Sequence, residues 1–185
     1  MKLAPSCAAI ALALMLGCGA SSQGAQVAPP TASAAVPSDV VGLTSRAEIE
    51  AAVPAWRDAI AAADPADETA RALHDVPPGA EVDVFLGTWC GDSRREVSRL
   101  FVALEIAERA GALPFAVRFI GVDRAKVAPG LSEDAGLRYV PTIVVRRDGV
   151  EVGRVVETAT RGIEQDLLDL LTGTRTGFLS LTRTP

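Results

Sequence analysis

The chain has 185 residues, 49% hydrophobic and 22% charged, which supports one packed domain with short additional segments and excludes wholesale disorder. Its 18 Lys and Arg and 23 Asp and Glu residues give a net charge of -5, so we expect no nucleic-acid binding, which needs a clustered basic surface. The single histidine, His74, excludes a multi-histidine zinc site. We therefore expect no metal and no cofactor.

The first residues have the pattern of an export signal. A short apolar run from Leu3 to Leu16 follows Lys2 and ends in small residues, and this order is typical of a secretory signal peptide. The segment from Leu14 to Cys18 resembles a bacterial lipobox, so we expect residues 1–17 to be a signal peptide of the lipoprotein type and Cys18 to be lipidated. The resemblance implies a protein anchored in the bacterial cell envelope, facing the periplasm or the exterior.

Two alternatives to this anchor stay open. One is ordinary signal cleavage a few residues after Cys18. The other is a retained membrane helix, although the apolar run is shorter than the roughly 20 residues that span a bilayer. Residues 18–42 are rich in Ala, Ser, Pro and Gly without hydrophobic periodicity, which predicts a flexible tether.

Residues 43–78 are expected to form a helical segment that packs on the domain. Thr44 or Ser45 can cap a helix, and one face of it carries Ile49, Val53, Trp56 and Ile60. Pro54 lies inside this stripe, so the helix is either kinked or restarts there. A shorter helix follows from Asp67 to Leu73, and His74 after it is expected at the surface.

Residues 79–172 alternate strand and helix patterns. Strands are expected over 81–86, 115–122, 142–146 and 150–156, with helices over 93–110 and 162–171 and a loop over 124–138. The turn Arg147-Asp148-Gly149 predicts an antiparallel hairpin between the last two strands. The sequence therefore indicates an α/β fold of order β-α-β then β-β-α, with a mixed central sheet flanked by helices and the N-terminal helical extension. Residues 173–185 are expected to form a C-terminal tail.

A cysteine stands between the first strand of this domain and its helix. Cys90 lies in the segment from Thr88 to Ser93, and after removal of Cys7 and lipidation or removal of Cys18 it is the one free thiol expected in the mature protein. A helix start stabilises the negative charge of a thiolate, the nucleophilic form. Arg94 and Arg95 can add to this effect, whereas Asp92 opposes it. A buried structural cysteine is the alternative.

Two short motifs resemble the thioredoxin superfamily. They are Trp89-Cys90-Gly91 after a strand and Val140-Pro141-Thr142 at the start of a later strand. The resemblance implies a thioredoxin-like fold over residues 79–172, a cis Pro141 beside Cys90, and a substrate-binding surface formed by Trp89, Gly91, Val140 and Pro141. It also implies thiols or disulfides of proteins or small molecules as partners. Within the superfamily, the chain is similar to proteins with Trp-Cys-Gly-Asp-Ser at the site and Gly-Val-Asp in the second strand, here residues 121–123.

The same motifs depart from a dithiol thioredoxin. Ser93 replaces the second, resolving cysteine, so no internal disulfide can form at this site. The buried acid of thioredoxins falls on Val84, one position from Asp83, which removes the usual proton relay. We therefore expect the catalytic set to be Cys90, Ser93 and Asp92, with Ser93 able to donate a hydrogen bond to the thiolate.

Two functions follow from these residues. The first is monothiol exchange through Cys90, isomerase-like or deglutathionylating, by a thiol-disulfide oxidoreductase that lacks the resolving cysteine. The second is a non-catalytic module that binds a peptide or protein. The resemblance to monothiol glutaredoxins, which bind an iron–sulfur cluster, is weakened by Asp92 and Trp89. A Cys-His protease would have to use His74 as its base. We expect a monomer.

Overall fold

The computed structural model describes residues 39–129 and 136–185. The expected signal peptide, the lipidation site Cys18 and most of the tether lie outside these residues. Within residues 39–129 and 136–185, no helix has the length and apolarity needed to cross a membrane.

The N-terminal segment forms one short strand and a series of short helices. After β1 (Gly42–Thr44), Ser45 caps α1 (Arg46–Ala52) through a capping box with Glu48. The predicted stripe is divided at Pro54, which precedes a second helix, α2 (Ala55–Ala61), because proline cannot donate the hydrogen bond that a continuous helix needs there. Then follow α3 (Asp67–Ala72) and the 3-10 turn η1 (Leu73–Asp75).

The sheet has six strands in the order β1-β3-β2-β4-β5-β6. Its central strands are β2 (Ala80–Leu86), β3 (Ala116–Gly121), β4 (Thr142–Arg147) and β5 (Val150–Val156). Strands β2 and β3 are parallel, whereas β4 pairs antiparallel with both β2 and β5. The mixed sheet and the antiparallel hairpin agree with the sequence analysis.

Neither of the two edge strands of the sheet was predicted from the sequence. Strand β1 uses Gly42, the last residue of the expected tether, and β6 (Gly177–Leu179) lies inside the expected tail. Strand β1 pairs antiparallel with β3, and β6 pairs parallel with β5. The close approach of β1 requires Gly121, since a Cβ there would overlap the Val40 carbonyl oxygen.

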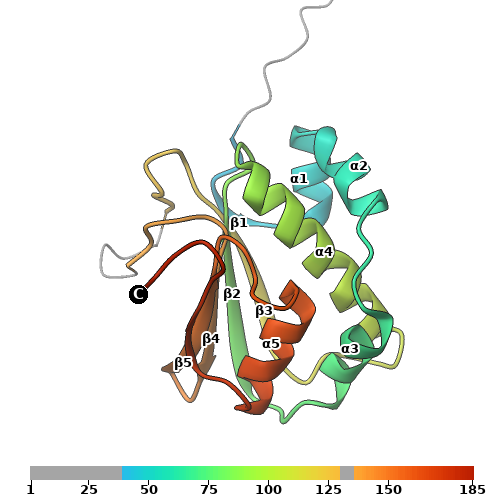
Figure 1. The fold of residues 1–185 in the computed structure, drawn as a ribbon. Coiled ribbons are helices and arrows are strands. Elements are labelled where there is room, and N and C mark those ends of the chain that lie inside the picture. Colours follow the sequence, from blue (N-terminus) through green and yellow to red (C-terminus); the bar gives the residue numbers. More distant parts are fainter. Residues whose placement is uncertain (1–38, 130–135) are drawn as a thin grey trace, which may run out of the picture. The chain divides into compact units, whose positions relative to one another are not determined.

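The helices lie on one side of the sheet (Figure 1). Helix α4 (Gly91–Glu108) packs against α2, α3 and α5 (Ile163–Thr172), and α5 contacts β4 and β5. The core between these helices and the sheet includes Trp56, Val84, Leu100, Ile143 and Leu167. On the opposite side lie residues 122–129 and the chain end after β6 (Figure 1). The described residues therefore form two layers, the sheet and the helices that cover one of its faces.

Candidate functional site

Cys90 occupies the turn between β2 and α4. It is the N-cap residue of α4, with an extended backbone, and its carbonyl oxygen accepts the first helical hydrogen bond from the Arg94 N–H at 3.0 Å. The thiol is free and half-buried. The 18 residues of α4 place the positive end of the helix dipole at this cysteine. Cys90 therefore lies at a helix start, as expected.

The loop before β4 reaches the same point. The Cys90 Sγ lies 3.3 Å from the Val140 carbonyl oxygen and donates a hydrogen bond to it. The Val140-Pro141 peptide bond is cis, as the resemblance implied. Val140 is buried in a small apolar cluster against which Trp89 and Cys90 pack. The structure thus brings together two motifs that are 50 residues apart in the chain.

Trp89 is fixed on both of its sides. Its indole N–H donates to the Val122 carbonyl oxygen at 3.2 Å, and a Cβ at Gly87 would lie 2.7 Å from the ring. The Arg124 guanidinium lies 5.2 Å from the centre of the ring. Val122 belongs to the segment 121–123 that the sequence analysis noted, and its role here is to hold Trp89 beside Cys90.

Ser93 is fully buried and faces the preceding loop. Its hydroxyl oxygen accepts a hydrogen bond from the Gly87 N–H at 3.1 Å. A hydrogen bond from Ser93 to the thiolate was expected, but within the described residues Ser93 forms no bond with Cys90. In this conformation Ser93 therefore stabilises the turn that carries Cys90.

Asp92 is neutralised by a neighbouring arginine. The Arg95 Nη1 lies 2.7 Å from the Asp92 Oδ1, and the Arg95 Nη2 donates to the Thr158 hydroxyl at 3.0 Å. Arg95 also binds Glu96 through its Nε. The expectation that Arg95 would support the thiolate directly is replaced by an indirect effect, since its charge compensates that of Asp92.

Trp56 and Thr88 support the site, and neither role was predicted from the sequence. The Thr88 carbonyl oxygen accepts from the Trp56 indole N–H at 3.2 Å, and the Thr88 hydroxyl accepts from the Val40 N–H at 3.2 Å. Trp56 was recognised only as a core residue of its helix. Nothing in the sequence links position 56 to position 88, because the contact arises only when α2 packs on α4.

Glu96 is a second acid close to the site. Only 7% of it is exposed, and this burial raises its pKa, against the opposing effects of the Arg95 guanidinium and of a hydrogen bond from the Ala159 backbone. Through the hydrogen bond from the Ala159 backbone, Glu96 joins α4 to the segment after β5. Its role could not be predicted from the sequence, since a glutamate next to an apolar helix face usually points to solvent.

Asp83 has no part in the site. It is 4% exposed and binds the Arg118 guanidinium at 2.7 and 2.9 Å, with Arg146 as a further partner. Val84 faces the helices, so alternation along β2 directs Asp83 to the opposite face of the sheet. Asp83 is therefore not placed to act as a proton relay for Cys90.

His74 lies at the far end of α4. A Cβ at Gly111, just beyond that helix, would lie 3.2 Å from the His74 ring. A helix of 18 residues is about 27 Å long at the usual rise per residue, so His74 cannot act as a base for Cys90. Among the described residues, no group of three or more His, Cys, Asp or Glu side chains is placed to hold a metal ion.

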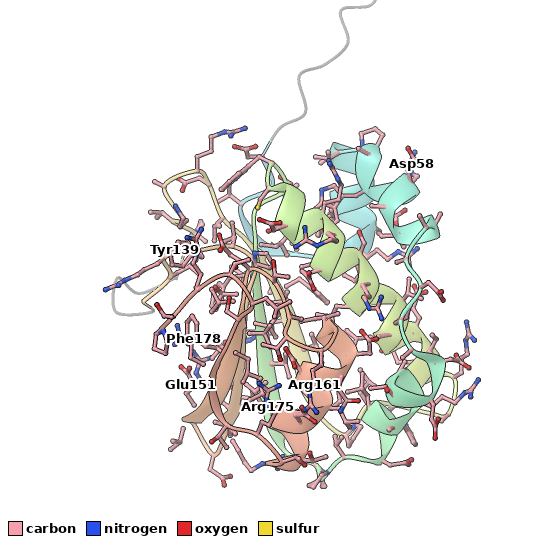
Figure 2. All side chains as sticks on the ribbon, in the orientation of Figure 1. Asp58, Tyr139, Glu151, Arg161, Arg175 and Phe178 are labelled. Atoms are coloured by element: carbon pink, nitrogen blue, oxygen red, sulfur yellow. The ribbon has the colours of Figure 1, made fainter. Side chains whose placement is uncertain are left out.

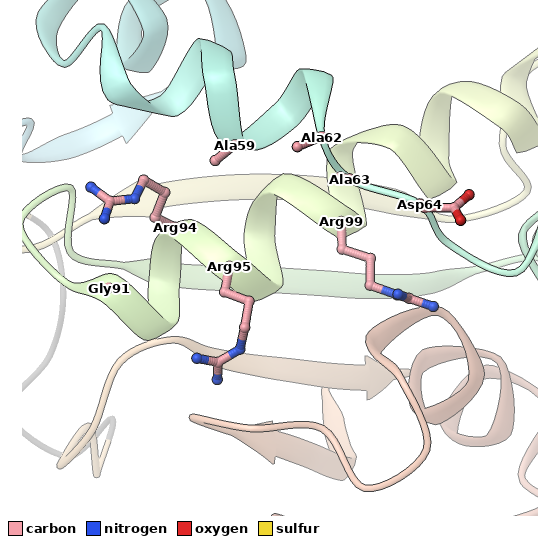
Figure 3. A pocket seen from close by; sticks show the side chains of 8 residues that line it. All are labelled: Ala59, Ala62, Ala63, Asp64, Gly91, Arg94, Arg95 and Arg99. Atoms are coloured by element: carbon pink, nitrogen blue, oxygen red, sulfur yellow. The ribbon is translucent and has the colours of Figure 1, made fainter.

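Two hollows adjoin the site. One has a volume of about 490 Å³ and lies between α2 and α4, lined by Ala59, Ala62, Ala63, Asp64, Gly91, Arg94, Arg95 and Arg99 (Figure 3). The other has a volume of about 400 Å³ and adjoins the loop before Pro141, with lining residues that include Arg138, Tyr139, Phe178 and Pro185. Tyr139 and Phe178 lie on the side of the sheet away from the helices (Figure 2).

Comparisons with known proteins found similarity to solved structures alone. No protein-family model matches it, and no curated protein matches it at a significant level. It is similar to a protein of unknown function from Pseudomonas aeruginosa, with 16% identity over 70% of this chain and 82% of that chain and a TM-score of 0.43. It is also similar to an HIV epitope-scaffold, with 18% identity, 70% and 78% coverage and a TM-score of 0.42. A third similar structure is a mutant thioredoxin from Halobacterium salinarum, with 25% identity, 60% and 86% coverage and a TM-score of 0.34.

Proposed function

We propose that residues 79–172 form a thioredoxin-like domain, with residues 43–78 packed on it and residues 173–185 following it, and that Cys90 performs monothiol thiol–disulfide exchange. The observation that carries this proposal is the half-buried Cys90 thiol at the start of α4, where the positive end of the helix dipole favours a thiolate. A thiol at a helix start that is only half-buried can meet the sulfur of a partner disulfide.

The reaction is a balanced exchange of sulfur partners. Cys90 loses its proton to solvent, and its thiolate attacks one sulfur of a partner disulfide. A bond forms between the Cys90 Sγ and that sulfur while the disulfide bond breaks, and the second sulfur leaves as a thiolate. Because Ser93 cannot attack the mixed disulfide, a thiol from outside the protein must do so and regenerate Cys90.

The test is the reactivity of Cys90 in the whole chain. Iodoacetamide should label the protein more rapidly than Cys90→Ala, which subtracts the labelling of Cys7 and Cys18. Glutathione disulfide should form a mixed disulfide at Cys90, seen by peptide mass spectrometry, and added thiol should reverse it. Labelling no greater than that of Cys90→Ala would overturn the proposal.

The second candidate is a non-catalytic binding module. It is favoured by the hydrogen bond from the Cys90 thiol to the Val140 carbonyl, because that bond requires the proton to remain on sulfur. In such a module the surface beside Pro141 would bind an extended peptide without exchange. Binding that survives in Cys90→Ala, together with an unreactive thiol, would select this candidate.

We propose further that the protein is exported and held in the cell envelope by a lipid on Cys18, after removal of residues 1–17. The support is the short apolar run that ends in Leu16-Gly17-Cys18. Metabolic labelling with a fatty acid should mark the natural protein and not Cys18→Ala. Full membrane partition of Cys18→Ala would contradict the anchor.

A further inference from the structure

The chain end after β6 returns to the loop before β4 (Figure 1). The Arg183 Cζ lies 4.4 Å from the centre of the ring of Tyr139, which belongs to that loop. The Leu181 N–H donates to the Thr158 carbonyl oxygen at 3.0 Å. We call residues 180–185 the C-terminal segment, and these contacts hold it beside the loop.

Glu157 is the residue that binds the C-terminal segment. Its carboxylate accepts hydrogen bonds from the Arg183 Nε at 2.5 Å, from the Arg183 Nη2 at 3.3 Å and from the Thr182 hydroxyl at 3.1 Å. Its backbone has a φ of 56°, in the left-handed region that residues with a side chain rarely adopt. Such a conformation persists only where the surrounding structure holds it, and the C-terminal segment supplies part of that support.

The same glutamate also holds the loop that reaches Cys90. The Glu157 N–H donates to the Pro141 carbonyl oxygen at 2.8 Å. The residue before this proline is Val140, whose carbonyl oxygen accepts the hydrogen bond from the Cys90 Sγ at 3.3 Å. A series of bonds therefore runs from Arg183 through Glu157 and the loop to the sulfur.

The Val140 carbonyl and the start of α4 act on the thiol in opposite directions. The helix dipole favours the thiolate. The carbonyl oxygen accepts the proton of the thiol, whereas it would face a thiolate with its own lone pairs, so it favours the protonated and unreactive form. The position of this carbonyl relative to the Cys90 Sγ therefore influences how readily the sulfur reacts.

The C-terminal segment is attached by contacts that water can replace. The side chain of Arg183 is 43% exposed, and Leu181 is 66% exposed. Thr184 and Pro185 border the hollow of about 400 Å³ next to the loop. A segment with few buried apolar contacts opens at a lower free-energy cost than the core, so it can detach while the domain stays folded.

We infer that the C-terminal segment restrains Cys90. While it is bound to Glu157, it holds the loop so that the Val140 carbonyl keeps the proton on the sulfur, and its release makes the thiol more reactive. Glu157 is a positioning residue, since it acts through the loop and touches no reacting atom. This inference rests on the proposed exchange function and adds the regulation of its site; the bonds that form and break are those described above.

Two measurements on the full chain test the inference. The first is the second-order rate at which glutathione disulfide forms a mixed disulfide with Cys90. The second is the infrared S–H stretching band of Cys90 at mildly acid pH, obtained by subtracting the spectrum of the same protein with Cys90→Ala. A thiol that donates to a carbonyl absorbs at lower frequency than a free one, so this band reports the bond to Val140 directly.

Variants of the C-terminal segment should change both measurements. Arg183→Ala should raise the rate about fivefold and move the band to higher frequency, and removal of residues 181–185 should do at least as much. Arg183→Lys keeps the charge and one bond to Glu157, so its values should lie between those of the natural protein and Arg183→Ala. Arg71→Gln is the matched control, because Arg71 is an exposed arginine paired with Asp67, and it should change neither measurement.

The outcomes separate the inference from the function on which it rests. If the natural protein reacts and Arg183→Ala reacts at the same rate, the exchange function stands and the restraint is wrong. A faster rate with an unchanged S–H band would mean that the C-terminal segment only covers Cys90, and would also overturn the inference. If Cys90 reacts in none of these proteins, both proposals fall.

Discussion

The serine at position 93 leaves the site with a single thiol, that of Cys90. We predict that Ser93→Cys forms an internal disulfide with Cys90 on mild oxidation, because residues at the N-cap and third helical positions lie on one turn. The protein should also gain dithiol reductase activity, since the second thiol attacks the mixed disulfide from within the molecule. Thiol titration and reduction of a model protein disulfide measure the two effects.

Ser93→Ala is the control for this substitution. It removes the hydrogen bond from the Gly87 N–H and should cost about 1 kcal/mol of the free energy of unfolding, without adding reductase activity. An oxidised Ser93→Cys that retains both thiols would show that the two side chains cannot meet, and would argue against the thioredoxin-like interpretation of the turn.

Asp83 stabilises the sheet and has no role in the chemistry of Cys90. We predict that Asp83→Ala lowers the free energy of unfolding by about 1–3 kcal/mol, because it leaves Arg118 and Arg146 without their shared carboxylate. The partial exposure of both arginines limits the loss. Glu81→Ala changes an exposed acid of the same strand and should have little effect in urea denaturation. A large change in the iodoacetamide rate of Cys90 in Asp83→Ala would place Asp83 in the site after all.

Some residues of the site could be predicted and others could not. Three residues could be predicted from the sequence because each belongs to a short motif of neighbours in the chain: Trp89, Cys90 and Pro141. The bond between Ser93 and Gly87, and the binding of Asp92 by Arg95, depend on side-chain orientation, which residue spacing alone does not determine. The bond from Trp56 to Thr88 could not be predicted at all, since it joins helix α2 to the loop before α4 and exists only in the packed fold.

At the scale of elements, α5 is joined to α4 by one ion pair that should make stability depend on pH. Burial acts to raise the pKa of Glu164, but the Arg99 guanidinium and the Ala66 N–H outweigh it, and the pKa lies below its ordinary value of 4.5. A lowered folded-state pKa contributes stability above the unfolded value and loses it as the pH falls through the folded value.

We therefore predict that Glu164→Gln lowers the free energy of unfolding by about 1–2 kcal/mol at pH 7, and that the deficit shrinks once the pH falls below 4.5. Urea denaturation at a series of pH values measures it. Glu151→Gln removes a more exposed pair with Arg154 and should cost at most about 0.5 kcal/mol. An equal deficit at acid and neutral pH would mean that Glu164 acts by packing and not by charge.

Elements with a periodic pattern were predictable, and elements made by pairing were not. Helix α5 and the hairpin of β4 and β5 follow from apolar spacing and from the Asp148-Gly149 turn. Strands β1 and β6 have three residues each, too few for any period to appear. They form because a neighbouring strand supplies unpaired backbone N–H and C=O groups to bond with. This pairing is present only in the folded sheet.

At the scale of the whole molecule, the N-terminal helical segment supports the site through one buried bond. We predict that Trp56→Phe lowers the free energy of unfolding by about 1–2 kcal/mol, because the buried Thr88 carbonyl loses its donor. The amides of residues 87–91 should also exchange with solvent faster. Hydrogen exchange with mass spectrometry measures the second effect.

Ile60→Val separates local support from general destabilisation. Ile60 is buried in the same helix as Trp56, and loss of one methyl group should cost about 1 kcal/mol. Exchange in residues 87–91 should remain as in the natural protein. Faster exchange in both variants alike would mean that α2 stabilises the fold without a particular connection to Cys90.

The short outer strands of the sheet have a consequence for pairing between copies of the chain. An outer strand presents unpaired backbone groups that can recruit a strand from another chain, and a long one invites aggregation. With β1 and β6 at the borders, each border presents three residues, while the seven residues of β2 and of β5 are enclosed. In the part of the chain that the structure describes, two three-residue strands therefore shield the longest strands from pairing with a strand of another copy.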